Sequence, residues 1–496
     1  MPKPHTIFQD HPSNFPTGSV VDGQSLFRKK QDQADFVVIG SGAAGGTAAQ
    51  LLSEAGFSVI ILEEGPWIRT EQFGVDVYPA MKTLFRNTGA QLANGRAPFP
   101  VIQGRCVGGS TTVNSAIAWR VPEEVIDHWN LETISYPNLE PHFEALDKAL
   151  TVKPVDNQIL GNHNSLFGQA ANKLGLSAQR IRRYDAGCDG SASCLTGCRS
   201  GKKMAMNISF IPQALQKGAK IYYSTRAEKI GRDNTVCAPN LKIFAKRGII
   251  LAASAIQTPG ILKRSGLRLK ALGKHLQAHP GTSIIARFDR DISMQSGATQ
   301  GYNSTHFLKS HGFKLEALSL PPELLCMRLP SVGPELMAQL DDYKKILNWA
   351  LVVKAKASGQ VKTLFGQDII QYTPTPADMK SMRDGYQILS QMMFAVGALE
   401  VYPHVHGMPI LRSPDDLKHW KTASLDPRDY SMMASHLFGT TRMGQDPSSS
   451  VVNQNFQVHD WPGIYVLDSS IFPSNIGVNP QHTIMAIARL GASRLI

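Results

Sequence analysis

The chain of 496 residues is 42% hydrophobic and 18% charged, which is ordinary for a folded protein and is enough material for two substantial domains. Its mean hydropathy is −0.15, and no uncharged apolar run reaches the roughly 18 residues that a bilayer span needs, so the sequence predicts a soluble protein without a membrane span. Lys and Arg outnumber Asp and Glu by 51 to 39, but no nucleic-acid-binding motif accompanies the net charge of +12, which excludes nucleic acid as a partner.

The first 34 residues are rich in Pro, His, Asp, Gln and Ser and contain no apolar core of a signal peptide, which favours a cytoplasmic location. We expect residues 1–34 to form an arm laid over the surface of the first domain, with a disordered tail as the alternative. Basic pairs occur at Lys29-Lys30, Arg182-Arg183 and Lys202-Lys203. These pairs could dock an acidic redox protein or an anionic lipid surface, although solvated surface charge is the favoured explanation.

A dinucleotide fingerprint follows the arm. A buried-strand pattern at residues 36–39 runs into the sequence GSGAAGG at residues 40–46 and a helix of small residues. Gly40 permits a tight turn, Gly42 lets the backbone approach a pyrophosphate, and Gly45 lets the helix pack against the strand. A second strand at residues 59–62 delivers Glu63, at the spacing where an acid accepts hydrogen bonds from an adenosine ribose.

Two later segments suit close approach of the backbone to a ligand. The glycine and hydroxyl run at residues 104–114 reads as a loop entering a helix, and it supplies the candidate cofactor contacts Gly108, Gly109, Ser110 and Asn114. Residues 248–259 begin as a buried strand and pass into small residues, with Pro259 predicted to open the next helix. An ordinary tight turn between packed elements is the alternative for both segments.

Three of the six cysteines, Cys188, Cys194 and Cys198, fall close together as Cys-x5-Cys-x3-Cys. Three thiolates can ligate an iron–sulfur cluster, but the last cysteine lacks the proline common after such ligands. A disulfide or buried thiols are favoured, and no metal site is predicted.

The middle of the chain reads as strands at residues 283–288, 313–320 and 346–356, followed by a helix at residues 376–398. Apolar residues recur at helical spacing along that helix, which indicates a packed core face rather than a substrate channel. His404-Val405-His406 could supply half of a metal site, but no third ligand lies nearby in the sequence, and His279-Pro280 reads as a turn.

The closing stretch combines SHLFGTTRMG at residues 435–444 with NPQHT at residues 479–483. His436 is the candidate general base, since a neutral imidazole has an unperturbed pKa near the operating pH, and Asn479 is positioned to donate a hydrogen bond to the same substrate oxygen. His482 is the competitor for the role of base. Between the two blocks a buried strand ends at Asp468, which contacts the cofactor or caps the following turn.

These blocks, in this order, resemble the glucose-methanol-choline (GMC) oxidoreductase family of flavoproteins over nearly the whole chain. The resemblance implies FAD and an α/β fold, with a Rossmann-like FAD-binding domain and a discontinuous substrate domain built on an antiparallel sheet. It implies an FAD-binding domain at residues 35–282, with inserted cap segments at about 120–200, and at 431–496, and a substrate-binding domain at 283–430. It also adds Thr483 to the cofactor contacts.

The resemblance further implies oxidation of a small-molecule alcohol to an aldehyde or ketone by hydride transfer to flavin N5, with His436 as base and Asn479 as its amide partner. Some members bond the flavin through a histidine where this chain has Val113, so we expect non-covalent FAD. The cysteine segment is similar to that of long-chain alcohol oxidases and to that of sugar dehydrogenases that pass electrons through an iron–sulfur cluster to a cytochrome partner. Such an electron-acceptor protein, and a hydroxynitrile-lyase-like reaction without redox change, are the alternatives.

Overall fold

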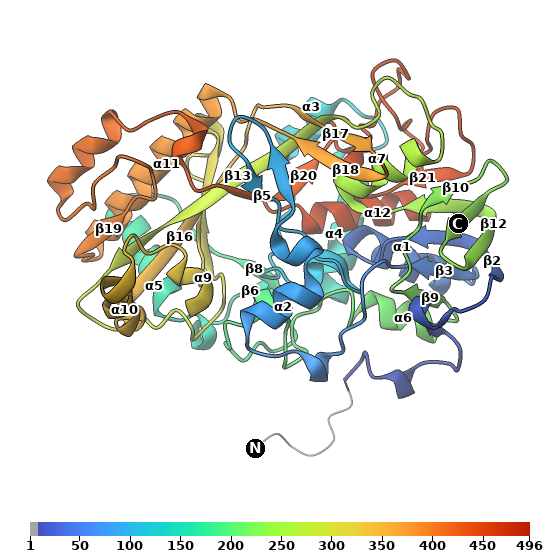
Figure 1. The fold of residues 1–496 in the computed structure, drawn as a ribbon, viewed down its shortest axis with the longest axis horizontal. Coiled ribbons are helices and arrows are strands. Elements are labelled where there is room, and N and C mark those ends of the chain that lie inside the picture. The colour runs from blue at the N-terminus through green and yellow to red at the C-terminus, as the bar shows by residue number, and fades with distance from the viewer. Residues whose placement is uncertain (1–7) are drawn as a thin grey trace.

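The first sheet takes its strands from both ends of the chain (Figure 1). The computed structural model describes residues 8–496; the first seven residues of the predicted arm lie outside the described residues. Six strands of this sheet run parallel, which buries the apolar runs that the sequence predicts as strands, and an antiparallel pair closes one edge. In spatial order the strands are β1 Val20–Asp22, β9 Lys220–Tyr223, β3 Val59–Leu62, β2 Lys30–Ile39, β12 Leu241–Leu251, β11 Thr235–Ala238 and β10 Lys229–Ile230, and β21 Ile464–Val466 also pairs with β12.

The described part of the predicted arm packs on this sheet. Strand β1 is its edge strand, and the carboxylate of Asp10 accepts hydrogen bonds from the backbone N–H (2.8 Å) and hydroxyl (3.0 Å) of Thr70. Strand β2 begins at Lys30, inside the segment predicted as an arm. The arm is therefore part of the domain from β1 onward.

The second sheet is mainly antiparallel and lies beside the first. Its longest strand, β13 Lys274–Arg287, pairs with four others, so the rest of the sheet is arranged around it. In spatial order the strands are β5 Phe99–Pro100, β4 Leu92–Asn94, β18 Gln367–Gln371, β17 Gly359–Leu364, β13, β16 Ile346–Val353, β15 Phe313–Ala317, β14 Tyr302–Ser304 and β7 Gln179–Arg180, with β19 Glu400–Tyr402 and β20 Met433–Phe438 also paired to β13. A separate ribbon joins β6 Val152–Pro154 to β8 Arg182–Tyr184.

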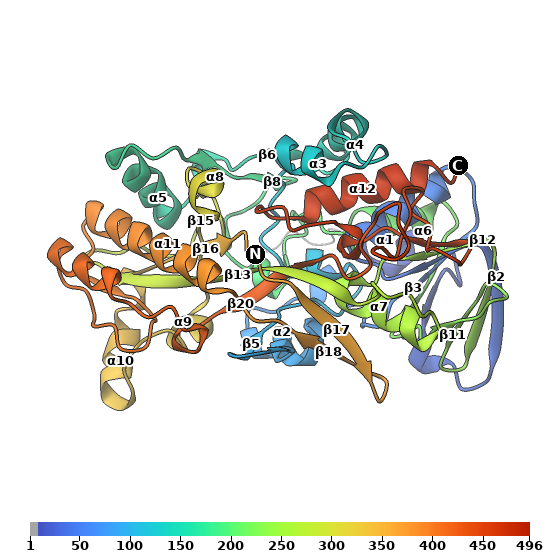
Figure 2. The same ribbon diagram turned by 90° about the horizontal axis from the view of Figure 1, so that it is seen from above.

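Helices cover the sheets in two groups (Figure 2). Helix α1 packs on β2 and β3, with α6 and α12 against it, while α11 and α5 cover the second sheet at β13, β15, β16 and β14. The α-helices are α1 Ala43–Glu54, α2 Val77–Leu84, α3 Glu123–Trp129, α4 Tyr136–Ala149, α5 Asn162–Lys173, α6 Phe210–Gln216, α7 Ser254–Arg264, α8 Leu308–His311, α9 Pro322–Cys326, α10 Gly333–Asp341, α11 Pro376–Ala395 and α12 Gln481–Ser493. Within the part of the chain that the structure describes, no helix has the length and apolar character that a bilayer crossing requires.

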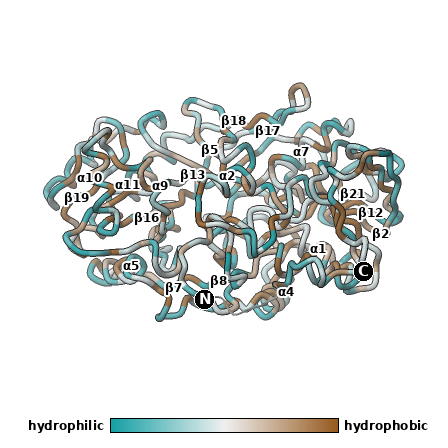
Figure 3. The backbone as a smooth tube through the Cα atoms, turned by 60° about the horizontal axis from the view of Figure 1, so that its bottom comes forward, coloured by the Kyte–Doolittle hydropathy of each residue, from teal (hydrophilic) through white to brown (hydrophobic). Residues whose placement is uncertain are grey.

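Each sheet has its own apolar core. The core of the first sheet contains residues of β2, β3, β12 and β21, and brown apolar segments gather where β2, β12 and β21 are labelled in the hydropathy view (Figure 3). The core of the second contains the predicted apolar face of α11, where Met379, Met382, Tyr386, Leu389 and Met393 are fully buried. The prediction of a packed stripe on this helix is confirmed.

Two local predictions are wrong. Pro259 lies inside α7 rather than at its start, since α7 begins at Ser254. A proline in a helix leaves the carbonyl four residues earlier without its backbone donor, and here that carbonyl, of Ala255, accepts a hydrogen bond of 2.6 Å from the Thr440 hydroxyl. His279-Pro280 is not a turn but lies within β13, where the pairing with β20 shifts register between Ala278 and Pro280.

Helix α1 approaches strand β2 so closely that a side chain is excluded at Gly45. A Cβ there would lie 1.9 Å from the carbonyl oxygen of Gly40, whereas a Cβ at Gly46 would meet first the sulfur of Met206, at 2.9 Å. We expect Gly45→Ala to cost about 1–3 kcal/mol of stability, because backbone cannot move aside. Gly46→Ala should cost less, since the end of a flexible side chain can shift and alanine favours the helix. Thermal melting of the two variants measures the difference, and equal melting temperatures would contradict the proposed packing.

Candidate active site

One large cavity is lined by residues of both sheets. Its volume is about 730 Å³, within the range of sites for cofactors and small ligands. Nine of the residues predicted from the sequence line it: Gly40, Gly42, Glu63, Gly109, Ser110, Asn114, His436, Asp468 and Asn479. Gly45, Gly108 and Thr483 do not line it, and they lie in the packing behind its wall.

The amino-terminal end of α1 opens into the cavity. Gly42 is the N-cap residue and has no side-chain cap, so the first backbone N–H groups of α1 are free of a capping side chain. Gly40 has φ = +102°, and a Cβ there would lie 2.4 Å from the Ala252 carbonyl oxygen. Gly109 faces Gly42, and a Cβ on Gly109 would lie 3.0 Å from the Gly42 Cα. This bare, glycine-lined helix end fits an anionic pyrophosphate.

Glu63 stands at the carboxyl end of β3 and is 6% exposed. Its Oε2 accepts hydrogen bonds from the backbone N–H (3.0 Å) and hydroxyl (2.6 Å) of Ser41, and its Oε1 accepts one from the Gly65 N–H (2.8 Å). Burial raises the pKa of this carboxyl, against these hydrogen bonds, which lower it. Glu63 thus holds the fingerprint turn, and its place on the cavity wall suits the predicted contact with a ribose.

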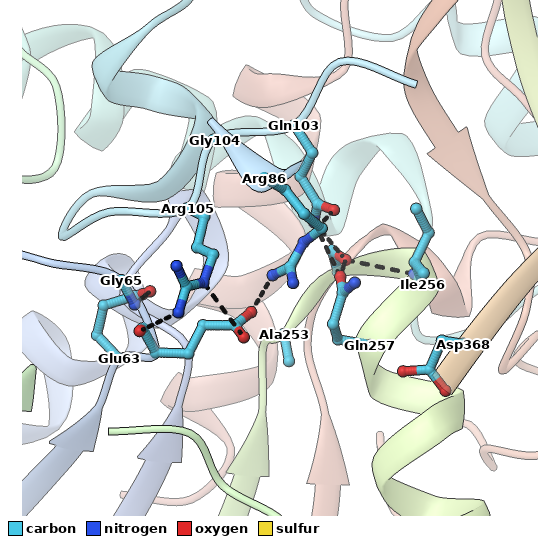
Figure 4. A network of polar contacts seen from close by, with 12 residues as sticks. Glu63, Gly65, Arg86, Gln103, Gly104, Arg105, Ala253, Ile256, Gln257 and Asp368 are labelled. Carbon is cyan, nitrogen blue, oxygen red and sulfur yellow. Dashed lines mark hydrogen bonds and ion pairs between the residues drawn. The ribbon is translucent and has the colours of Figure 1, made fainter. Parts of the chain in front are cut away.

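Arg86 is a cavity residue that the sequence analysis missed. Figure 4 shows it between the turn of Glu63 and Gly65 on one side and Gln103 on the other. Its Nε donates to the Gln103 Oε1 (3.0 Å), and its Nη2 is paired with the carboxylate of Glu64. Arg105, in the loop that begins at Gly104, donates to the Glu64 carbonyl (3.2 Å). No motif surrounds Arg86, and Arg105 lies in the predicted loop at residues 104–114 without having been selected, so only the fold brings the two arginines together at Glu64.

Lys203 fixes the loop at residues 104–114. Its ammonium donates to the carbonyl oxygens of Thr112 (2.7 Å), Asn114 (2.9 Å) and Cys194 (2.9 Å), and burial lowers its pKa. The Asn114 amide in turn donates to the Gln481 Oε1 (2.5 Å), at the start of α12. Lys203 and Arg183 are 4% and 2% exposed, so their predicted place in surface basic pairs is wrong: each charge is buried among hydrogen-bond acceptors.

The cysteine segment borders the cavity. Leu195 and Thr196 form part of the cavity wall, while Cys188, Cys194 and Cys198 line a separate cavity of about 10 Å³ together with Arg183 and Lys203. The three are free thiols, and the Arg183 Nη2 donates to the Cys194 sulfur at 3.1 Å. Burial raises the pKa of Cys194, but Arg183 and Lys203 outweigh it and the net shift is downward. The disulfide that was one expectation for this segment is absent among the described residues.

His436 lies on β20 and faces the cavity, with a second histidine behind it. The Nδ1 atoms of His436 and His279 are 3.2 Å apart, so one proton is shared between them. The Nε2 of His279 accepts a hydrogen bond of 2.9 Å from the Gly477 N–H when its proton is on Nδ1; when the proton is on Nε2, this nitrogen donates instead to the Asn475 Oδ1, 3.3 Å away, and the Gly477 hydrogen bond is lost. When His436 holds the shared proton on Nδ1, its Nε2 lone pair is free to accept another.

The surroundings keep His436 neutral. Burial lowers its pKa to about 4, with Glu316 raising and Lys314 lowering it. At neutral pH the imidazole is therefore deprotonated, as a general base must be before it acts. The competitor His482 is excluded from this role by its position: it does not line the cavity, and its Nε2 lies 3.1 Å from the Asp147 carboxylate on α4.

The amide of Asn479 is oriented by a buried lysine. The Lys314 ammonium, with 0% side-chain exposure, donates to the Asn479 Oδ1 (2.6 Å) and to the Glu316 Oε1 (2.5 Å). An ammonium can only donate, so it selects the amide oxygen and leaves the Asn479 Nδ2 as the group available to a ligand in the cavity. The Gln300 amide donates to the second carboxylate oxygen of Glu316 (2.9 Å). Lys314, Glu316 and His279 were missed from the sequence, because no motif surrounds them.

Both carboxylate oxygens of Asp468 accept hydrogen bonds from other groups of the protein. Its Oδ2 accepts from the Ser254 N–H (2.9 Å) and the Thr258 hydroxyl (2.5 Å), and its Oδ1 accepts from the Ser470 N–H (2.9 Å). It thereby caps the turn after β21, which was the alternative to a cofactor contact, and it also remains on the cavity wall. Thr483 is fully buried in α12, behind that wall.

A glycine-lined helix end and a carboxylate at one end of a cavity, with an imidazole and an oriented amide at the other, define an enzyme that uses a dinucleotide cofactor. Sequence profiles of the GMC oxidoreductase family match residues 34–281 and 363–488. The chain belongs to the GMC oxidoreductase family, and it is an FAD-dependent oxidoreductase that acts on CH–OH groups.

Relatives agree with this assignment, and a solved structure agrees with the fold. The chain is 33% identical to an uncharacterised GMC-type oxidoreductase of Mycobacterium tuberculosis, over 98% of this chain and 80% of that one. It is 25% identical to a long-chain-alcohol oxidase of Arabidopsis thaliana, over 96% of this chain and 68% of that one. The fold is similar to a variant of Aspergillus oryzae formate oxidase, with a TM-score of 0.74, 16% identity, and coverage of 94% of this chain and 98% of that one.

Proposed function

We propose that the protein oxidises a primary or secondary alcohol with His436 as the general base and Asn479 as the donor that holds the substrate oxygen. The observation that carries the proposal is the pairing of a neutral imidazole with an amide whose oxygen is already occupied. The His436 pKa is lowered to about 4, and the Lys314 ammonium occupies the Asn479 Oδ1. Both side chains line the cavity that also receives the amino-terminal end of α1.

The residues act on the substrate hydroxyl in a definite order. The Asn479 Nδ2 donates to the substrate oxygen and fixes its position. His436 Nε2 then accepts the hydroxyl proton, while Nδ1–H donates to His279. The positive charge that forms on His436 is stabilised by Glu316, whose carboxylate raises the pKa of His436, and the Lys314 ammonium opposes it. His436 is thus unprotonated before the reaction and becomes protonated only when it accepts the hydroxyl proton of the substrate.

The chain's own residues provide a place for FAD. Gly42, Gly109 and the end of α1 would hold the pyrophosphate, Glu63 the ribose, and Ser110 and Asn114 the part nearer His436, consistent with their places on the cavity wall. When bound there, FAD supplies the acceptor for the hydride that leaves the carbinol carbon. We assign cofactor binding to residues 35–282 and 431–496, and substrate binding to 283–430, because all three ranges line the cavity; β4, β5, the first part of β13 and β20 extend the first two ranges into the second sheet.

The substrate is proposed to have an extended apolar body. The wall beyond His436 is rich in apolar side chains, contributed by Leu318, Leu320, Leu324, Met327, Met432 and Met433. Met327 is 80% exposed and also lines the cavity, so the cavity reaches the surface beside α9. Several relatives at about 25% identity are named long-chain-alcohol oxidases, which agrees with this shape.

A second candidate function rests on the cysteine segment. The Lys203 ammonium donates hydrogen bonds both to the Cys194 carbonyl of this segment and to the Asn114 carbonyl of the loop that lines the cavity. The three cysteines line a small cavity together with two buried cations, Arg183 and Lys203. If the three sulfurs, as thiolates, held an iron–sulfur cluster, the protein would be able to pass electrons from FAD to an acceptor protein. Within the described residues 8–496, no group of His, Cys, Asp and Glu side chains is placed to hold a metal ion, so the cluster would require these cysteines to rearrange. Iron and acid-labile sulfide in the anaerobically purified protein would establish this function, and their absence from active enzyme would exclude it.

The role of His436 is tested by substitution. We expect His436→Ala to lower kcat by about 10²–10⁴-fold with FAD retained, because the hydroxyl proton loses its acceptor. Asn479→Asp should also lower kcat by roughly 10²-fold, since it keeps an oxygen for Lys314 but loses the N–H donor. The measurement is anaerobic bleaching of the flavin absorbance by a panel of alcohols, with the exposed His406→Ala as control.

Either of two results would overturn the proposal. Unchanged flavin reduction in His436→Ala would remove the base from the mechanism. A flavin that stays oxidised while wild-type enzyme cleaves a hydroxynitrile would establish the lyase alternative instead.

The pH dependence follows from the environment of His436. Because burial lowers its pKa from 6.5 to about 4, the base stays deprotonated through mildly acidic pH. We expect kcat/KM to remain level between pH 7 and pH 5 and to fall about tenfold per pH unit below 4. Steady-state rates in buffers of constant ionic strength measure this, with flavin content recorded at each pH. An acid limb near 6.5 would show that the imidazole is solvated in the working enzyme.

The cofactor is proposed to be non-covalent. Val113 occupies the position where some members of the family bond the flavin through histidine, and it lines the cavity without a nucleophilic atom. Acid precipitation of the holoenzyme should leave all of the flavin in the supernatant. Flavin absorbance that stays with the precipitated protein would contradict this.

A further inference from the structure

The strongest unexplained group on the cavity wall is Arg328, which follows α9 and is 9% exposed. Its Nη1 donates to the Thr282 hydroxyl (2.9 Å) and the Ser283 carbonyl (3.2 Å), both on β13. Within residues 8–496, no hydrogen bond of the structure uses its Nε or Nη2 atoms, and no carboxylate forms an ion pair with it. The free edge of the guanidinium is the planar fork that binds a carboxylate with two hydrogen bonds.

The charge of Arg328 is not balanced by its neighbours. The groups that its charge influences are Tyr386 and His404, and neither carries negative charge at neutral pH: burial raises the pKa of Tyr386, while burial and Arg328 lower the pKa of His404 to about 3. The Tyr386 hydroxyl and the His404 Nε2 are themselves buried atoms without a hydrogen-bond partner among the described residues. A buried cation with no acid beside it is costly, so a site that keeps one is suited to an anion that arrives with the ligand.

The position of Arg328 beside β13 sets the separation between the anionic group of a ligand and the hydroxyl that reacts at His436. Thr282 and Ser283 stand three and four residues along β13 from His279, the partner of His436. At about 3.3 Å per strand residue, the two residues that anchor the guanidinium lie roughly 10–13 Å along β13 from His279. The apolar residues Leu318, Leu351 and Met432 line the same cavity. A ligand that meets both ends must carry a hydroxyl, an apolar chain and an anionic group, in that order.

We propose that Arg328 is a specificity residue that binds the carboxylate of the substrate, and that the preferred substrate class is a medium-chain hydroxy acid with the hydroxyl and the carboxylate at opposite ends. The inference rests on the proposed function, because it assigns a substrate class to the same cavity. The carboxylate binds the Nε and Nη2 edge of Arg328 while the hydroxyl binds Asn479 and His436. The apolar chain lies along the wall beside β13.

The test compares two substrates that differ only in the carboxylate. Holoenzyme is assayed with ω-hydroxydecanoate and with decanol, and the ratio of their kcat/KM values is measured for wild type, Arg328→Leu and Arg328→Lys. We expect the wild-type ratio to favour the hydroxy acid, and Arg328→Leu to lower that ratio about ten- to a hundredfold. Arg328→Lys should fall between them, because lysine keeps the charge but lacks the fork. Arg290→Leu removes the same charge from an exposed position that follows the end of β13 and does not line the cavity, and it should leave the ratio unchanged.

A second measurement keeps the site testable without turnover. Decanoate, which has no hydroxyl, is titrated into the holoenzyme and its binding is followed by the change in flavin absorbance. We expect Arg328→Leu to weaken this binding at least tenfold, with thermal melting and flavin content showing that the variant is folded. Equal decanoate binding and an unchanged substrate ratio in Arg328→Leu would overturn the proposal while leaving alcohol oxidation intact. Failure of both substrates to reduce the flavin would instead contradict the proposed function, and decanoate binding would then decide the anion site alone.

Discussion

The reactive end of the cavity depends on one buried ammonium group. Lys314 comes from the second sheet, yet its Nζ donates a hydrogen bond to Asn479, which precedes α12, a helix that packs against α1 beside the first sheet. Its charge is balanced by Glu316 on the same strand and lies 4.7 Å from the centre of the Trp119 ring. The two ends of an asparagine amide have nearly the same shape, so a neutral hydroxyl could accept either orientation. A group that can only donate removes this ambiguity and decides which atom of Asn479 a ligand meets.

Both sheets contribute residues to the cavity, and several elements connect them. Cofactor-side elements, the end of α1 and the carboxyl ends of β2 and β3, belong to the first sheet, whereas His279 and His436 belong to the second. Strand β13 pairs with β20 and so carries both histidines in register. Helix α7 then links β12 to the second sheet, with Thr440 satisfying the carbonyl that Pro259 leaves free. The cavity lies where these connections meet.

The sequence predicts the features whose physical cause is local. The fingerprint glycines are fixed by a turn, a helix end and one close helix–strand contact, all within a few residues of each other, and the apolar face of α11 follows from helical period alone. His436 and Asn479 could be selected because each lies in a sequence block, at residues 435–444 and 479–483, that resembles the GMC family. His279, Lys314 and Glu316 could not, since their contacts depend on the register of strands far apart in the chain. For Arg183 and Lys203 the sequence led to a wrong prediction. Charged residues are usually at the surface, but here a thiol and carbonyl oxygens accept hydrogen bonds from the two buried cations, and the sequence does not reveal these partners.

The route of the chain through the two sheets also has a consequence for how the enzyme is made. Strand β20 pairs with β13 in the second sheet, and β21 pairs with β12 in the first. Asn479 follows both strands in the sequence. On a ribosome, the first sheet can gather β2, β3, β9 and β12 early, but the second sheet is not whole until Phe438 has emerged, and the first sheet not until Val466. Domains that fold as they are synthesised bury apolar surface as soon as they can. Here residues Ile249–Leu251 of β12 pair with a strand more than two hundred residues downstream, so this apolar edge of the nascent chain has no strand partner until β21 is synthesised.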